Sequence, residues 1–160
     1  MIIRPAEERD YTAIRSVLLA AFPDSNEADL VERLRAGGFA EIELVAAAGP
    51  EIVGHILLSP MEAPFRALGL GPVSVTPVHQ GEGIGGRLIE HGHAMARANN
   101  WQAIFLVGEP EYYERFGYSL QAAGPFQCVY SGPYFMMLPL QDVSAVQGIV
   151  AYAPPFAELD

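Results

Sequence analysis

The residues whose types and spacing most clearly indicate a chemical role form a glycine-rich loop, Gly81-Glu82-Gly83-Ile84-Gly85-Gly86, in which four of the six residues are glycine. Residues without side chains let consecutive backbone N–H groups face one concavity, and the helical pattern beginning at about Ile84 would add the positive end of its dipole. Because the chain contains no lysine, backbone amides would supply most of the donors, with Arg87 as a candidate auxiliary cation. The loop therefore predicts a binding site for a phosphate-containing anion.

Two well-known anion-binding loops fit this stretch only in part. Gly81 to Gly86 satisfies G-x-G-x-x-G, the dinucleotide fingerprint, and Glu109 stands 23 residues after Gly86, where a ribose-binding acid is expected. However, the residues TPVHQ separate the strand pattern from the first glycine, and too little chain follows for the remaining βαβ units of that fold. A P-loop fits less well, since Arg87-Leu88 stand where Lys and Ser or Thr are required. A nucleotide-dependent oxidoreductase thus rests on the literal glycine pattern alone.

A third interpretation accounts for more of the chain. Gln80 to Gly85 matches Q/R-x-x-G-x-G/A, and the second matching segment is Glu111-Tyr-Tyr-Glu-Arg-Phe-Gly-Tyr118, of the type Y-x-x-x-G-F. With these two motifs the sequence resembles the GNAT superfamily of acyl-CoA-dependent N-acetyltransferases. It is more narrowly similar to the YhbS-like branch, through LGPVSVTPVHQGEGIG, VGEPEYYERFGY and GIVAYAPPF. One departure is Leu106, which stands where many members carry an asparagine that faces the pantetheine.

The resemblance implies a fold and a co-substrate. The fold is α/β (α+β), the acyl-CoA N-acyltransferase (GNAT) fold: a mixed sheet of about six to seven strands, flanked by about four helices and splayed between the fourth and fifth strands. The co-substrate is acetyl-CoA, and no metal is implied. Its pantetheine arm would lie in the gap between the strand that ends at Val75 and the strand Ala103–Val107. The residues expected to contact it are Val73, Val75, Gln80, Gly81, Glu82, Gly83, Ile84, Gly85, Gly86 and Arg87.

The resemblance also implies direct attack of a primary amine on the thioester. Such a reaction needs a deprotonated amine, a donor for the oxyanion and a proton for the leaving thiolate. Tyr113 occupies the tyrosine position of the family motif and is the expected proton donor, and the backbone N–H of Val75 is the expected oxyanion donor. For the base we expect Glu109, with Glu62 and His55 as rivals on the third strand. A non-catalytic acyl-CoA-binding or sensing module is the alternative function.

The elements that must position these residues can be read from hydrophobic spacing and turn signals. A first helix is predicted to begin with Glu7, Glu8 and Asp10 in its first turn, where negative charge is favoured. It continues through Ile14, Val17, Leu18, Ala21 and Phe22, which follow one helical stripe, and Pro23 ends it. Further helices are predicted over Asn26–Arg35, about Ile84–Ala98 and Pro110–Phe116. Strands are predicted over MIIR, Glu41–Ala47, Ile52–Ser59, Leu68–Val75, Ala103–Val107, Tyr134–Leu138 and Gly148–Tyr152. Gly69, Gly71 and Pro72 suggest a bulge or a close backbone approach in the fourth strand.

Composition limits the partners. The 160 residues fit a single domain, taken here as 1–160, and a net charge of −10 disfavours nucleic acid and anionic membranes. The N-terminus lacks the apolar core of a secretory signal, so we expect a cytoplasmic protein. The single cysteine, Cys128, is expected to be a structural thiol.

The acceptor is expected to be a small-molecule or peptide amine. Its contacts would come from two segments, residues 22–27 and 132–136, which together would form an acidic and aromatic mouth. Pairing of an exposed late strand could also join two copies as a homodimer.

Overall fold

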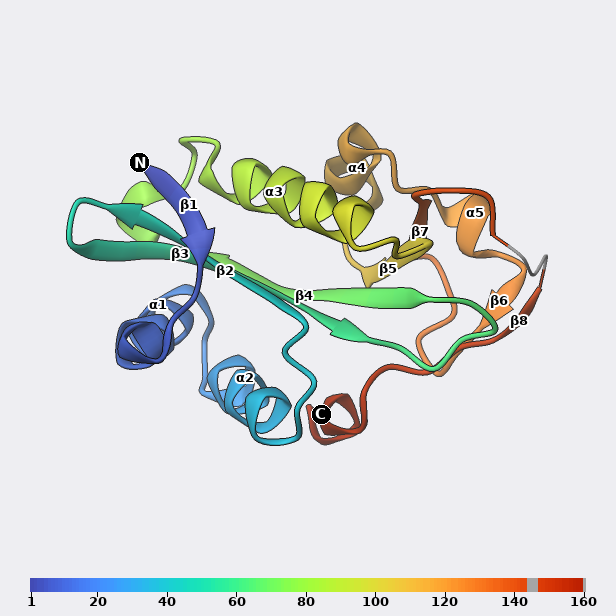
Figure 1. Cartoon of the computed structure of the whole chain (residues 1–160), viewed down its shortest axis with the longest axis horizontal. Coiled ribbons are helices and arrows are strands. Elements are labelled where there is room, and N and C mark those ends of the chain that lie inside the picture. Colours follow the sequence, from blue (N-terminus) through green and yellow to red (C-terminus); the bar gives the residue numbers. More distant parts are fainter. Residues whose placement is uncertain (144–146, 160) are drawn as a thin grey trace.

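The computed structural model describes residues 1–143 and 147–159. Its centre is a six-stranded sheet with the order β1-β2-β3-β4-β5-β7 (Figure 1). The strands are β1 (Ile2–Pro5), β2 (Ile42–Ala48), β3 (Glu51–Pro60), β4 (Ala67–Val75), β5 (Ala103–Val107) and β7 (Phe135–Pro139). All neighbours pair antiparallel except β4 and β5, which are parallel. The predicted mixed sheet is therefore confirmed.

Helices cover both faces of this sheet (Figure 1). On one face lie α1 (Tyr11–Ala21) and α2 (Asn26–Ala36), whose apolar stripes pack against Val45 and Leu57. On the other face α3 (Ile84–Ala98) packs through Leu88 and Ile89 against β2, β3 and β4. Alternate residues along each strand point to opposite faces, so the same strands supply both cores.

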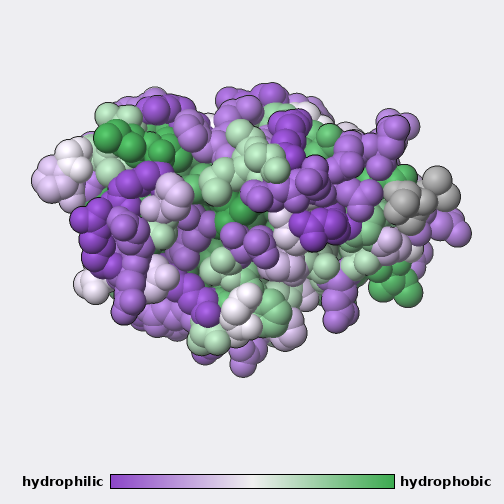
Figure 2. Space-filling model, in the orientation of Figure 1, coloured by the Kyte–Doolittle hydropathy of each residue, from purple (hydrophilic) through white to green (hydrophobic). Residues whose placement is uncertain are grey.

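Short elements complete the described chain. They are the 3-10 turns η1 (Glu8–Asp10), η2 (Pro77–His79), η3 (Glu114–Phe116) and η4 (Pro154–Glu158), the helices α4 (Pro110–Tyr113) and α5 (Leu120–Ala123), and the strands β6 (Phe126–Gln127) and β8 (Gly148–Ile149). The visible face is mostly hydrophilic with smaller hydrophobic areas (Figure 2), in keeping with the net charge of −10.

The predicted splay lies between β4 and β5. Their pairing runs from Ala67 with Ala103 to Gly69 with Phe105 and ends there, although β4 continues to Val75. On the other edge of β4 the register with β3 shifts, because Ile56 pairs with Val73 but Leu58 pairs with Leu70. Gly71 and Pro72 thus lie opposite Leu57 alone and form a bulge with one extra residue, which bends β4 away from a straight ladder.

Gly69 allows close packing on β4 and is not part of the bulge. A Cβ atom there would lie 2.6 Å from the Tyr152 ring, so the glycine allows an aromatic ring of the C-terminal segment to pack directly on β4. The signal for close backbone approach is therefore explained by Tyr152.

The C-terminal third differs from the expectation. Gly148–Tyr152 is not a strand of the main sheet, because β8 is only two residues long and pairs with β6 in a separate two-stranded sheet. A further helix, α5, is present beyond the four predicted; with four residues it is too short to produce a visible period.

Candidate active site

The glycine loop joins β4 to α3. Gly81 and Gly83 both have φ of +82°, a left-handed conformation that glycine adopts without strain, and Gly83 is the N-cap of α3. The Gln80 side-chain Nε2 donates to the Val75 carbonyl at 3.0 Å and so ties the loop back to the end of β4. This arrangement leaves the first turn of α3, with its free N–H groups, at the end of the splayed strand.

A pocket of about 410 Å³, here called the glycine-loop pocket, opens against this turn. Seven of the predicted residues line it: Val75, Gln80, Gly81, Gly83, Ile84, Gly85 and Gly86. Glu82 and Arg87 are exposed and are not among its lining residues. Glu82 instead lies 3.5 Å from the ring of His79, measured from carboxylate oxygen to Nδ1.

One positively charged side chain of this pocket, that of Arg115, was not predicted from the sequence. His79 and Arg115 both line it, and the Arg115 guanidinium lies 4.7 Å from the centre of the Tyr112 ring, which also lines the pocket. The available signal was the spacing of three residues between Tyr112 and Arg115, which places two side chains on one face of a helical turn. The pocket thus combines the amides of a helix N-terminus with a guanidinium, a combination suited to phosphate groups.

The backbone of β4 presents its polar groups to the splay. Thr76 N–H donates to the Val53 carbonyl at 2.9 Å, and bonded pairs alternate along an antiparallel ladder. The backbone groups of Val73 and Val75 therefore point away from β3, toward the gap that opens beside β5. Gln80 takes the Val75 carbonyl, so the Val75 N–H and both groups of Val73 are the ones directed into the gap.

A second pocket, of about 350 Å³, lies at the other end of the splay and is here called the aromatic pocket. Its lining includes Val73 and the Gly71-Pro72 bulge from β4, Val107 from β5, and Tyr113 from α4. The opposite wall comes from α2 and the C-terminal segment and includes Glu27, Tyr152 and Phe156. Of the two segments expected at the acceptor mouth, the first contributes Phe22 and Glu27, whereas residues 132–136 do not line the pocket.

Adjacent residues connect the two pockets. Val75 lines the glycine-loop pocket and Val73 lines the aromatic pocket, and Tyr112 and Tyr113 divide in the same way. One strand end and one short helix therefore border both spaces.

Tyr113 is held as a neutral phenol. Its ring packs directly over Gly108, where a Cβ atom would overlap it, and it meets the Tyr112 ring edge-on with centroids 4.9 Å apart. Burial raises the pKa of Tyr113 to about 12, with a smaller effect from Tyr112. The hydroxyl is thus protonated throughout the neutral range and can donate a proton at the aromatic pocket.

The structure does not bring the three expected bases to either pocket. Glu109 is exposed at the N-cap of α4, where its carbonyl accepts from the N–H groups of Tyr112 and Tyr113. Glu62 lies beyond the end of β3, exposed, in a backbone bridge with Ala151. None of these residues, nor His55, is among those that line the two pockets.

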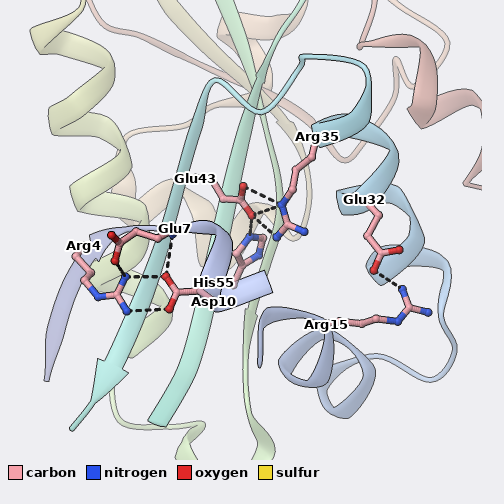
Figure 3. A network of polar contacts seen from close by, with 8 residues as sticks. All are labelled: Arg4, Glu7, Asp10, Arg15, Glu32, Arg35, Glu43 and His55. Carbon is pink, nitrogen blue, oxygen red and sulfur yellow. Dashed lines mark hydrogen bonds and ion pairs between the residues drawn. The ribbon is translucent and has the colours of Figure 1, made fainter. Parts of the chain in front are cut away.

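His55 belongs to a buried polar network on the α1 and α2 side of the sheet (Figure 3). Its Nε2 lies 2.8 Å from a Glu43 carboxylate oxygen, and Arg35 donates to the same oxygen at 2.6 Å. Burial lowers the pKa of His55, and the adjacent Glu43 opposes this change. Sequence reasoning could not separate this structural role from a catalytic one, because the partners come from α2 and β2.

Other reactive side chains are also accounted for by packing. His93 is buried on α3, with Nε2 2.9 Å from the Tyr118 hydroxyl. Cys128 is partly buried, and burial raises the pKa of its thiol.

Across residues 1–143 and 147–159, no three side chains of His, Cys, Asp and Glu gather as a metal site would require. None of the helices in these ranges combines the length and apolar character that crossing a bilayer demands.

Comparison with known proteins connects this geometry to a family. Residues 2–121 match the family model described as an acetyltransferase (GNAT) domain. The chain is 29% identical over 164 residues to the uncharacterized N-acetyltransferase YhbS of Escherichia coli K12, covering 98% of each chain. It is 37% identical over 120 residues to the uncharacterized N-acetyltransferase YjhQ of the same organism, covering 70% of this chain and 66% of that protein.

Solved structures agree with this assignment. The fold is similar to that of E. coli YhbS in complex with CoA, with a TM-score of 0.91, 28% identity and coverage of 98% of this chain and 91% of that one. A GNAT family acetyltransferase from Brucella melitensis in complex with acetyl-CoA gives a TM-score of 0.82 and 35% identity, with 97% of each chain covered. The chain therefore belongs to the GNAT family of N-acetyltransferases.

Proposed function

We propose that this protein transfers the acetyl group of acetyl-CoA to a primary amine that enters the aromatic pocket, by direct attack of the amine on the thioester. The observation that carries the proposal is the division of neighbouring residues between two pockets. A ligand with a phosphate end and a reactive end can lie along β4 and α4 with one end in each pocket. The similar proteins from E. coli and B. melitensis bind CoA and acetyl-CoA respectively, which supports the same choice of co-substrate here.

The chain's residues suit each part of that ligand. The amides of the loop from Gly81 to Gly86, the first turn of α3 and the Arg115 guanidinium would hold the pyrophosphate. The outward-directed backbone groups of Val73 would hold a pantetheine amide, as an additional strand would, whereas the N–H of Val75 is left for the thioester. Leu106 is 1% exposed and packed in the core, so backbone groups rather than a side-chain amide make these contacts.

Tyr113 and Val75 are proposed to act on the thioester. The Val75 N–H is directed to the gap and would donate to the oxyanion that forms at the carbonyl carbon. The Tyr113 hydroxyl, protonated because burial raises its pKa to about 12, would donate a proton to the sulfur as the C–S bond breaks. The exposed Glu109 lines neither pocket, and the proton acceptor is considered below.

Calorimetric titration with acetyl-CoA tests the cofactor site. Gly85 lines the glycine-loop pocket, and a Cβ atom there would lie 3.5 Å from the Tyr112 hydroxyl, so a side chain can be added without backbone strain. Gly85→Glu places a carboxylate where the pyrophosphate should lie, and like charges should weaken binding by about tenfold or more. Gly85→Gln adds the same volume without the charge, so it should bind acetyl-CoA more weakly than wild type but clearly more tightly than Gly85→Glu.

Two results would contradict the proposal. Equal acetyl-CoA affinity for Gly85→Glu and Gly85→Gln would place the phosphates elsewhere, and binding of NADH in place of acetyl-CoA would favour the dinucleotide interpretation.

Transfer itself is measured as amine-dependent thiol release. Because the chain has no lysine, acetylated lysine formed in such an assay cannot come from the enzyme.

A further inference from the structure

The aromatic pocket contains a carboxylate that its surroundings do not neutralise. Glu27, in the first turn of α2, is the one acidic side chain among the described residues that line the pocket. Its Oε1 atom is buried, and no hydrogen-bond partner for it exists in the described part of the chain. The neighbouring carboxylates of α2 differ, since Asp29 and Glu32 both pair with Arg15.

A buried carboxylate oxygen without a donor is unfavourable, because it has lost water and gained no partner. A second polar atom shares this condition: the Tyr152 hydroxyl is buried and has no hydrogen-bond partner among residues 1–143 and 147–159. Both residues line the same pocket, which lies where the thioester end of the co-substrate is proposed. The pocket therefore lacks one donor-rich, positively charged group.

The rest of the lining determines what such a group can be attached to. Phe22, Leu30, Tyr152, Phe156 and Leu159 form a wall that is apolar and largely aromatic. Aromatic faces stabilise a nearby cation and pack well against alkyl or aryl carbon. With one carboxylate in the described lining, a second positive charge on the ligand would lie unpaired among apolar side chains, which is costly.

The volume of the aromatic pocket limits the size of the ligand that it can hold. At about 350 Å³ the pocket is at the lower end of the range for small-molecule sites, roughly 300 to 1,000 Å³. An alkylamine or arylalkylamine fits this space, whereas an oligosaccharide with several amines would exceed it.

We infer that Glu27 binds the amine of the acceptor and accepts its proton, and that the acceptor is a small monoamine with an apolar alkyl or aryl body. The inference rests on the proposed transfer reaction, for which it supplies the missing base. The ammonium gives one proton to the Glu27 carboxylate, and the neutral nitrogen then attacks the carbonyl carbon. The C–S bond breaks, sulfur takes the Tyr113 proton, and the second nitrogen proton returns through water to the Tyr113 oxygen.

Amine binding can be measured without turnover. Calorimetric titrations with n-hexylamine and with the neutral n-hexanol, in the presence of CoA, would compare wild type, Glu27→Gln and Glu32→Gln. Glu27→Gln keeps the shape but removes the charge, and should weaken n-hexylamine by about tenfold or more while leaving n-hexanol nearly unchanged. Glu32→Gln removes a charge from the same helix outside the pocket lining and should bind both probes as wild type does. Equal affinity of wild type and Glu27→Gln for n-hexylamine would overturn the role of Glu27.

The acceptor class has its own test. Putrescine, with two charges, and Nα-acetyl-lysine methylamide, which represents a peptide, should both bind wild type more weakly than n-hexylamine or 2-phenylethylamine. Tighter binding of either of the first two would refute the apolar monoamine assignment.

Proton acceptance is tested by turnover with two amines. Glu27→Gln should lower kcat with n-hexylamine but much less with 2,2,2-trifluoroethylamine, whose fluorines leave it largely unprotonated at neutral pH. An equal loss of kcat with both amines would refute the base assignment. If wild type binds n-hexylamine through Glu27 yet releases no thiol from acetyl-CoA, the proposed function fails and the amine site stands. If wild type and Glu27→Gln release thiol equally with every amine, the inference fails and the proposed function stands.

Discussion

Acidification tests whether the buried pair of His93 and Tyr118 depends on a neutral imidazole. His93 is 2% exposed, and burial, with a smaller effect from Arg97, lowers its pKa from 6.5 to about 4. As the pH falls, the unfolded chain therefore binds a proton at this residue before the folded protein does. The stability that depends on neutral His93 is fully present above pH 6.5 and is lost progressively as the pH falls toward about 4.

The size of the effect follows from the shift of the pKa. A change from 6.5 to about 4 corresponds to about 3 kcal/mol, since one pKa unit is worth about 1.4 kcal/mol. The free energy of unfolding of a domain of this kind is roughly 5 to 15 kcal/mol. Protonation of one histidine would therefore remove a substantial part of the total stability. Between the two pKa values the free energy of unfolding should fall by up to about 1.4 kcal/mol per pH unit.

Urea unfolding at several pH values between 7 and 4 measures this contribution. His93→Gln keeps a hydrogen-bonding side chain opposite the Tyr118 hydroxyl but cannot take up a proton, so its stability should depend less on pH than that of wild type. The control is His91→Gln, which alters an exposed position of the same helix and should follow wild type. His55 is common to all three proteins, so its contribution cancels. Parallel curves for wild type and His93→Gln would refute the reasoning, because His93 would then bind protons equally in both states.

Two further predictions concern the site. Tyr113→Phe should lower kcat by about a hundredfold, the usual scale for loss of a general acid, while acetyl-CoA affinity stays near that of wild type; unchanged kcat at saturating substrates would remove Tyr113 from the reaction. Arg115→Gln should weaken acetyl-CoA binding by about fivefold, near the upper limit for an exposed charge pair, as measured by calorimetry. Arg87→Gln should weaken it less, because Arg87 does not line the glycine-loop pocket, and equal losses for the two variants would contradict that distinction.

The sequence predicted best those elements that are specified locally. The bounds of α3, Ile84–Ala98, agree with the prediction because the glycines before the helix and its apolar stripe both lie within the segment. The splay of β4 could be anticipated from Gly71 and Pro72, since a bulge is encoded in the strand that carries it. By contrast, the two-residue strand β8 depends on its pairing with β6 and has too few residues for a pattern.

The sites depend on tertiary packing, and the sequence predicted them less well. Arg115 lines the glycine-loop pocket only because α4 and η3 pack against the start of α3, and no local pattern reports that contact. Glu27 was one of two acidic residues in a segment expected near the acceptor, and its special position arises from the apolar residues that surround it from other elements. His55 is a candidate base by sequence alone, whereas in the structure its Nε2 is hydrogen-bonded to Glu43 of β2, which in turn accepts from Arg35 of α2.

If the aromatic pocket holds the amine as proposed, the division of β4 and α4 between the two pockets restricts how the enzyme can change its choice of amine. An insertion or deletion of one residue in either element would shift Val73 against Val75, or Tyr112 against Tyr113, and so disturb the donor and acceptor ends together. The start of α2 and the C-terminal segment from Tyr152 to Leu159 border the aromatic pocket only. Under the proposed function, substitutions there would alter the accepted amine while the thioester is held as before. New acceptor preferences are therefore most accessible to evolution, and to engineering, through these two segments.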